Sequence, residues 1–320
     1  MLARVLAWRP TEAVLRRTFL GALVTNTVIV VTGGAVRLTA SGLGCPTFPR
    51  CTDQSLVATR EMGAHGAIEF GNRMLTFVLS VAVAAALVTA WRARRRDLVR
   101  PAILLFLGIV AQAALGGVTV LTGLNPVTVM AHFLVSMGLI AVAVLAHERA
   151  VGHRATAQPV NRALTTGAVL LSATVAVTLF LGTVVTGTGP HSGDKNASHR
   201  LPFDLEAVTQ LHADFVFLVI GLTVGLLLAA RAATAAAPVP RRIGILLGVV
   251  LAQGLVGYVQ YVTDLPVALV AAHVLGACLV WIATLRVLLS AVPPRAYVAD
   301  RLSRSAAAGS PREQVSAATR

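Results

Sequence analysis

Four polar side chains lie inside long apolar stretches of this chain: Asn72, His132, His212 and His273. Ionisable side chains at membrane depth are costly, so they have a functional interpretation by default. Histidine is a common axial ligand of haem iron, and helical bundles build cofactor sites from residues on facing helices. These residues therefore favour haem binding. The alternatives are histidines that bond only to backbone or water, and zinc, for which no third or fourth ligand accompanies them.

Two of the histidines belong to a segment that occurs twice. In both copies a glutamine and a histidine are twenty positions apart, as Gln112 and His132 and as Gln253 and His273. Three further positions recur, Gly116, Leu124 and Val129 as Gly257, Leu265 and Val270. Matched positions in a repeat make a chance placement of these histidines less plausible.

The two copies differ in the partner of the repeated histidine. His212 lies at the depth of His273, as a six-coordinate haem requires, whereas Asn72 takes the place of His212 in the first copy. Asparagine is a poor iron ligand, so a haem held by His132 alone would keep an open or weak sixth position. That position is where chemistry would occur.

Two side chains near Asn72 could contribute to such chemistry. Glu69 lies one helical turn away and on the same face. A carboxylate there could move protons or stabilise a cation, and a structural ion pair with Arg73 is the alternative. His65, one turn before Glu69, could ligate the iron in place of Asn72, or it could simply lie at the membrane interface.

The composition of the chain indicates that transmembrane helices position these residues. The 320-residue chain is 56% hydrophobic and 12% charged, whereas soluble domains have about 25% charged residues. Eight apolar stretches have the roughly 20 residues needed to cross a bilayer, and they lack the period-two pattern of barrel strands. The predicted fold is an all-α bundle of eight transmembrane helices at about 18–36, 67–90, 101–121, 127–146, 164–185, 207–230, 243–262 and 267–290.

The net charge of +14 reflects membrane topology rather than nucleic-acid binding. Of the 27 Lys and Arg, twenty-one lie before the first stretch, in every second loop, or near and beyond the end of the last one. This alternation follows the positive-inside rule and predicts a multi-pass protein of the cell membrane with both termini in the cytoplasm. We therefore expect the protein to be surrounded by membrane lipid.

The eight stretches divide into two similar halves. Val30–Gly33 ends the first stretch as Val184–Gly187 ends the fifth, and each half has an even number of spans. The sequence therefore predicts two parallel-repeat four-helix bundles rather than an inverted repeat. We assign residues 1–150 to the N-terminal half, 151–292 to the C-terminal half and 293–320 to a disordered cytoplasmic tail.

Two cysteines flank a short segment in the first outer loop. Cys45 and Cys51 enclose five residues, two of them proline, on the side of the membrane where disulfides persist. A disulfide is one interpretation, and a redox-active or metal-binding pair is the other.

Several motifs together resemble one known family. Residues 33–46, which read GGAVRLTASGLGCP, are similar to the first outer loop of bacterial haem A synthases. Residues 68–73 (IEFGNR) and 182–191 (GTVVTGTGPH) resemble that family's second span and the loop after its fifth. The resemblance extends over nearly the whole chain to about residue 290.

The resemblance implies an oxidoreductase that oxidises the C8 methyl group of haem O to a formyl group by successive hydroxylations, giving haem A for terminal oxidases. It implies that the N-terminal half holds haem O as substrate and the C-terminal half holds haem b. The residues implied are His132 as substrate-haem ligand, His212 and His273 as haem b ligands, Glu69 as the essential carboxylate, and Cys45 with Cys51 as a disulfide.

Many members of the family have histidine where this chain has Asn72. The sixth ligand of the substrate haem is then Asn72, His65 or no residue. The expected partner is the haem O synthase that supplies the substrate. The alternative function is a dihaem cytochrome b-type electron carrier, which equal bis-histidine sites would favour. A transporter would instead show broken helices near the midplane.

Overall fold

The structure is a computed structural model that describes residues 9–152, 161–195 and 199–291. Within them the chain forms eight long α-helices, a short 3-10 helix and no β-strand. Each long helix is apolar enough to cross a membrane, which confirms the predicted all-helical membrane fold. In chain order the elements are α2 (Glu12–Leu38), η1 (Arg60–Met62), α3 (Gly63–Arg92), α4 (Arg96–Leu121), α5 (Pro126–Val151), α6 (Arg162–Thr188), α7 (Leu205–Ala232), α8 (Pro238–Val262) and α9 (Val267–Ala291).

Capping residues extend the helices beyond their apolar stretches. The side chains of Thr11, Asn125, Asn161 and Asp204 accept hydrogen bonds from backbone N–H groups in the first turns of α2, α5, α6 and α7. Such caps contribute about 1 kcal/mol each. Gly152, with φ of 70°, ends α5 in the left-handed region that glycine enters without strain.

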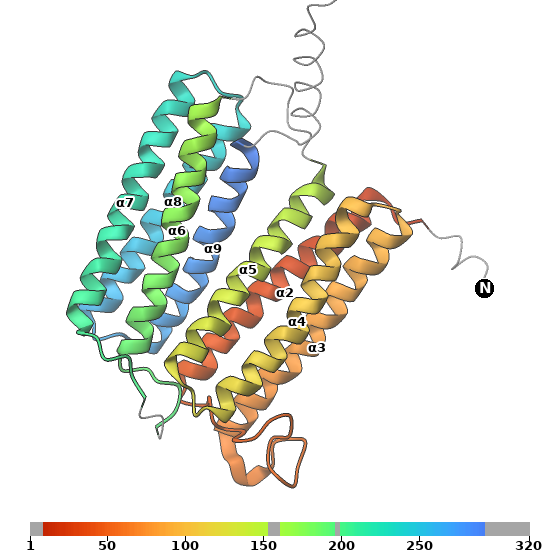
Figure 1. Cartoon of the computed structure of the whole chain (residues 1–320), viewed down its shortest axis with the longest axis vertical. Coiled ribbons are helices and arrows are strands. Elements are labelled where there is room, and N and C mark those ends of the chain that lie inside the picture. Colours follow the sequence, from red (N-terminus) through yellow and green to blue (C-terminus); the bar gives the residue numbers. More distant parts are fainter. Residues whose placement is uncertain (1–8, 153–160, 196–198, 292–320) are drawn as a thin grey trace, which may run out of the picture.

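The helices form two groups of four that lie side by side (Figure 1). In the first group, α2 and α4 each contact both α3 and α5; in the second, α6 and α8 each contact both α7 and α9. Among the described residues, the diagonal pairs α2/α4, α3/α5, α6/α8 and α7/α9 make no backbone contact. Each group is therefore a ring of helices with a centre that only side chains or a ligand can fill.

The predicted division of the chain is compatible with these two groups, but the parallel repeat and the boundary near residue 150 remain predictions. Residues 153–160, which connect the groups, lie outside the described residues, as does the predicted tail at 293–320.

Helices α5 and α9 meet at the interface between the groups, with α2 and α6 beside them. The indole Nε1 of Trp281 on α9 donates to the carbonyl oxygen of Met137 on α5 at 2.9 Å. Near the end of α5, the buried carboxylate of Glu148 accepts from Arg242 at 2.6 Å and from Arg286 at 2.8 Å. These bonds join the groups through side chains that lipid could not satisfy.

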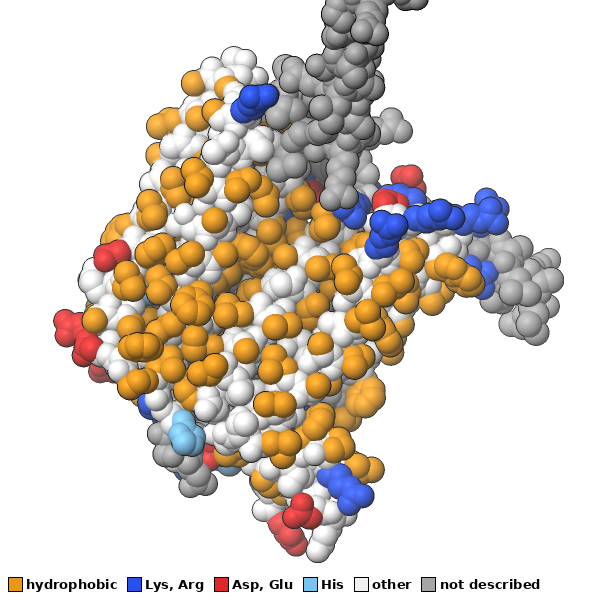
Figure 2. Space-filling model, in the orientation of Figure 1, with side chains coloured by type: hydrophobic (Ala, Val, Ile, Leu, Met, Phe, Trp, Pro, Cys, Tyr) orange, Lys and Arg blue, Asp and Glu red, His pale blue; other side chains and the backbone are white. Residues whose placement is uncertain are grey.

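Large apolar side chains cover the outward faces of the helices. Phe77, Val81, Phe217, Leu255 and Tyr258 are each at least 64% exposed. Apolar side chains spread over the visible face, and charged ones gather toward its ends (Figure 2). Soluble monomers rarely expose such continuous apolar surface. This surface is that of a multi-pass membrane protein.

We predict that Glu148→Gln lowers the thermal midpoint of the purified protein, because it leaves Arg242 and Arg286 without their carboxylate. Removing one partner of a buried ion pair costs roughly 3–5 kcal/mol, and the half-exposed Arg286 places this case at the lower end of that range. Asp97→Asn is the matched control, since Asp97 pairs with Arg95 at an exposed site, where the cost is at most about 1 kcal/mol. Equal midpoints for the two variants in a thermal scan would contradict the role of Glu148.

Candidate haem-binding site

The four polar residues lie on alternate helices of the two rings. Asn72 is on α3 and His132 on α5, while His212 is on α7 and His273 on α9. Each is partly buried and lies within the first three turns of its helix, so all four have similar depth below the end that carries the α2–α3 and α6–α7 loops, here called the loop end. In each ring the two residues occupy diagonal helices, on opposite sides of the centre.

His132 and His273 are tethered to the preceding helix in the same way. The Nε2 of Gln112 on α4 donates to the carbonyl oxygen of His132 at 2.9 Å, and the Nε2 of Gln253 on α8 donates to that of His273 at 2.9 Å. The repeated spacing of twenty residues thus corresponds to a hydrogen bond between neighbouring helices. This bond fixes the helix pair at the level of the imidazole.

A glycine on the preceding helix lies against each imidazole. A Cβ atom built on that glycine would lie 3.0–3.3 Å from the ring Cε1 atom, closer than most real Cβ contacts. The missing side chain is therefore what lets the ring lie close to its neighbouring helix. The pairs are Gly116 with His132, Gly182 with His212, and Gly257 with His273.

The ring nitrogens differ in their partners. The Nδ1 of His212 lies 3.1 Å from the carbonyl oxygen of Thr178. Donation from Nδ1 to this oxygen leaves the Nε2 lone pair free to bind a metal, as in most metal-ligating histidines. The Nδ1 atoms of His132 and His273 are buried and have no hydrogen-bond partner within the described residues.

These features fit a haem in the second ring. His212 and His273 lie at similar depth on α7 and α9, two diagonal helices that make no contact within the described residues. Close glycine packing and one oriented tautomer favour two neutral imidazoles as axial ligands. No cluster of three or more His, Cys, Asp or Glu that could hold a metal ion occurs in the described part of the chain.

The first ring offers a weaker second ligand. Asn72 accepts a hydrogen bond at its Oδ1 from the Thr32 hydroxyl on α2, at 2.8 Å. Its amide is therefore already engaged by the neighbouring helix. His132 fits the same haem chemistry as His273, but the diagonal helix of its ring carries an amide rather than an imidazole at this depth.

His65 lies nearer the loop end than Asn72. Its Nδ1 is 3.0 Å from the hydroxyl of Ser41, and its exposed ring lines a cavity of about 400 Å³ at the loop end. Asp194 and Lys195 line the same cavity. The structure thus brings His65 together with the loops rather than with His132.

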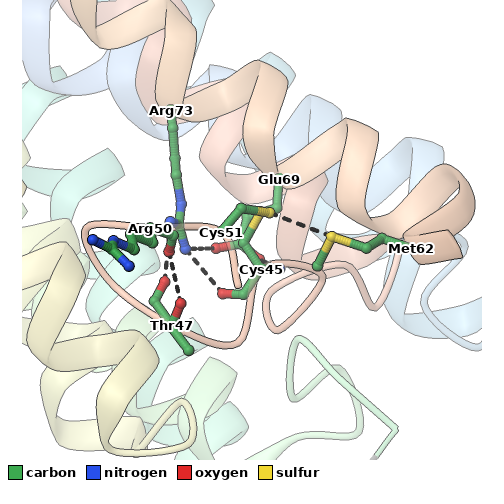
Figure 3. Close-up of polar contacts among 7 residues, drawn as sticks. All are labelled: Cys45, Thr47, Arg50, Cys51, Met62, Glu69 and Arg73. Carbon is green, nitrogen blue, oxygen red and sulfur yellow. Dashed lines mark hydrogen bonds and ion pairs between the residues drawn. A yellow bond between two sulfur atoms is a disulfide. The ribbon is translucent and has the colours of Figure 1, made fainter. Parts of the chain in front are cut away.

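Glu69 holds the first loop directly through one hydrogen bond and indirectly through its ion pair with Arg73 on the same helix. Its buried carboxylate accepts from the Cys45 backbone N–H at 2.5 Å and from Arg73 at 2.6 Å. Arg73 also donates to the carbonyl oxygens of Cys45, Thr47 and Arg50 (Figure 3). The ion pair considered from the sequence is present, and it anchors the loop beside the first ring.

Cys45 and Cys51 form a disulfide, so the first of the two interpretations is the one the structure shows. Both cysteines are fully buried, and the Met62 sulfur lies 3.5 Å from that of Cys51 (Figure 3). Between them, Phe48 packs against Gly117 of α4, where an added Cβ would lie 2.5 Å from its ring. The loop is thereby attached to α3 and to α4.

Sequence reasoning missed two parts of the site. Arg73 was considered only as a partner of Glu69, although it binds three loop carbonyls as well. The glycines facing the imidazoles were noticed only as repeated positions. The available signal was their spacing, since Gly116 and Gly257 each follow the tethering glutamine by one helical turn.

We predict that Gly257→Ala disturbs haem ligation in the second ring. The new methyl would lie 3.0 Å from Cε1 of His273, so the ring must move away from its ligating position. Gly248→Ala on the same helix is the control, because a Cβ there meets nothing within 4 Å. The low-spin haem signal, measured by optical and EPR spectroscopy of purified protein, should weaken in the first variant only. An unchanged signal in Gly257→Ala would show that close packing does not position the ligand.

Comparisons with known proteins identify the family of this chain. Residues 16–192 match the COX15-CtaA family, described as cytochrome oxidase assembly protein. The haem A synthase of Listeria monocytogenes serotype 4b (strain F2365) is 33% identical over 118 residues, which are 36% of this chain and 38% of that protein. That of Geobacillus kaustophilus (strain HTA426) is 31% identical over 117 residues, 35% of each chain.

The aligned region thus spans little more than a third of these relatives. The family match is longer and covers more than half of the chain, including the disulfide loop, Glu69 and His132. The chain belongs to the COX15-CtaA family, to which the haem A synthases belong.

Proposed function

We propose that this protein is a haem A synthase that oxidises the C8 methyl group of haem O to a formyl group, by successive hydroxylations, to give haem A for terminal oxidases. The observation that carries the proposal is the difference between the two rings. One has two imidazoles on diagonal helices, and the other has one imidazole opposite an amide, with a buried carboxylate one turn away. The name of the aligned relatives supports it.

In this proposal His212 and His273 hold haem b, and His132 holds the substrate haem O. Haem b would supply one-electron transfer in the second ring. The residues of the first ring orient the substrate: Gly116 seats the imidazole of His132, and Gln112 fixes the helix that carries it. With Asn72 in this position, the haem face opposite His132 would have no strong ligand. A protein that only carries electrons would not need such an open coordination position.

Glu69 is the residue proposed to handle protons. Each of its oxygens accepts one hydrogen bond in the structure, from Arg73 or from the Cys45 N–H. A carboxylate oxygen can accept a second bond, so Glu69 retains the capacity to take a proton from a group beside Asn72. The ion pair with Arg73 holds the carboxylate in place.

We further propose that the loop end faces the outside of the cell membrane and that both termini are cytoplasmic. The arginine-rich connections at the opposite end follow the positive-inside rule, and the disulfide would then lie in the oxidising compartment. Haem O would come from the haem O synthase in the same membrane, because so apolar a substrate partitions into lipid.

The proposal is tested by identifying the pigments that the protein makes and holds. Co-expression with a haem O source should yield haem A or its hydroxylated intermediate in HPLC of extracted haems, together with haem b. His212→Ala should remove or convert the low-spin haem b signal. Haem b with no haem A or intermediate would instead support the dihaem electron carrier.

We predict that Glu69→Gln retains haem binding but loses turnover, with haem O or its hydroxylated intermediate accumulating. Losing a positioned acid–base group lowers a rate by about 10²–10⁴-fold. The variant Arg73→Gln distinguishes proton transfer by Glu69 from anchoring of the loop. It removes the hydrogen bonds from Arg73 to three loop carbonyls but keeps the Glu69 carboxylate. The measurement is HPLC of haems from matched amounts of each variant. If Glu69→Gln makes haem A at the wild-type rate, the role of Glu69 is structural. The role is also structural if both variants lose haem A equally and in proportion to their protein yield.

A further inference from the structure

Arg37 is a cation near the end of α2 that the proposed function does not use. Its Nη2 donates to the carbonyl oxygen of Thr186 on α6, in the second group, at 2.6 Å. Its Nε is buried and has no hydrogen-bond partner within the described residues. The guanidinium therefore crosses from the first group to the second, and most of its donors have no partner among the residues that the structure describes.

The position of Arg37 follows from its neighbours on α6. Thr186 lies one turn beyond Gly182, the glycine that packs against the imidazole of His212. Because α6 runs toward the loop end, Thr186 is about 6 Å closer to that end than Gly182, at 1.5 Å per residue. Arg37 is thus held one turn above the level of His212.

Contacts with α9 give the same level independently. A Cβ at Gly34, three residues before Arg37, would lie 3.4 Å from the side chain of Val274, and Val274 follows His273. Since α2 also runs toward the loop end, Arg37 lies about 5 Å beyond this contact. Two helices therefore place the guanidinium at the rim of the second ring, just above both proposed haem ligands.

Within the described residues, no carboxylate compensates the charge of Arg37. Arg37 forms no ion pair within the described residues, and its charged neighbour is Arg200, which is also a cation. Arg200 donates to the carbonyl oxygens of Gly189, His199 and Pro190, so it is engaged by the loop. A partly buried cation without a counter-ion is costly, which indicates that an anion belongs beside it.

We propose that Arg37 binds a carboxylate of the haem held by His212 and His273, so that the first group completes the binding site of the second. The inference rests on the proposed haem b site and adds a residue to it. Haem b carries two propionates, and a planar guanidinium is well suited to bind a carboxylate with paired hydrogen bonds. The bond from Arg37 to Thr186 positions the guanidinium before the ligand arrives.

The test compares two ligands that differ only in the carboxylates. Full-length protein from haem-deficient cells is titrated with haem b and with haem b dimethyl ester, following the low-spin signal of the bis-histidine site. Wild type should bind haem b more tightly than the ester, by about 10–100-fold for a charge-assisted contact. Arg37→Met should lose most of this difference, with weaker binding of haem b and unchanged binding of the ester.

Two further variants complete the experiment. Arg37→Lys keeps the charge but not the paired geometry, so it should retain part of the preference. Arg60→Met removes an exposed cation at the same end and should leave both affinities unchanged. Equal binding of the two ligands by wild type, or equal weakening of both by Arg37→Met, would overturn the proposal. If haem b gives wild type no low-spin signal, the haem b assignment itself fails, and the role of Arg37 with it.

Discussion

The site depends on how an imidazole is accommodated between closely packed apolar helices. A histidine ring needs space, and in three helix pairs a glycine on the preceding helix provides it. The packing limits the rotation of the ring, since the ring edge lies against backbone rather than a mobile side chain. In two pairs a glutamine also bonds to the histidine carbonyl, so helix spacing and ring position are set together. The rest of the structure serves to keep these pairs at one depth.

The loop end shows a second use of polar groups in an apolar setting. Arg73 donates to three carbonyls of the loop segment between Cys45 and Arg50, which has no helix or strand, and Glu69 balances the charge of Arg73 and accepts the Cys45 N–H. A structural role and a proton-transfer role are compatible for Glu69. The carboxylate that holds the loop lies one helical turn from Asn72 on α3.

The sequence was sufficient to predict where the helices lie along the chain, but not which helices contact each other. Hydropathy located all eight spans, because the thickness of a bilayer demands long apolar runs. It also identified Asn72, His132, His212 and His273, since polar residues in such runs are rare. It could not show that Trp281 bonds to Met137 or that Glu148 meets two arginines of the other group. Those partners are more than 90 residues apart, and nothing in the local pattern specifies which helices become neighbours.

The interface between the groups explains why both would be needed in one chain. His132 on α5 and His273 on α9 lie on helices that pack against each other, so the two proposed haems would occupy neighbouring rings. Trp281 and Glu148 hold this pair of helices together at two levels, and Arg37 reaches across at the loop end. Under the proposed function, a separate second group would lack the cation at its rim, and a separate first group would lack a neighbouring haem. On that proposal, the contacts that join the groups serve the function as well as the stability of the fold.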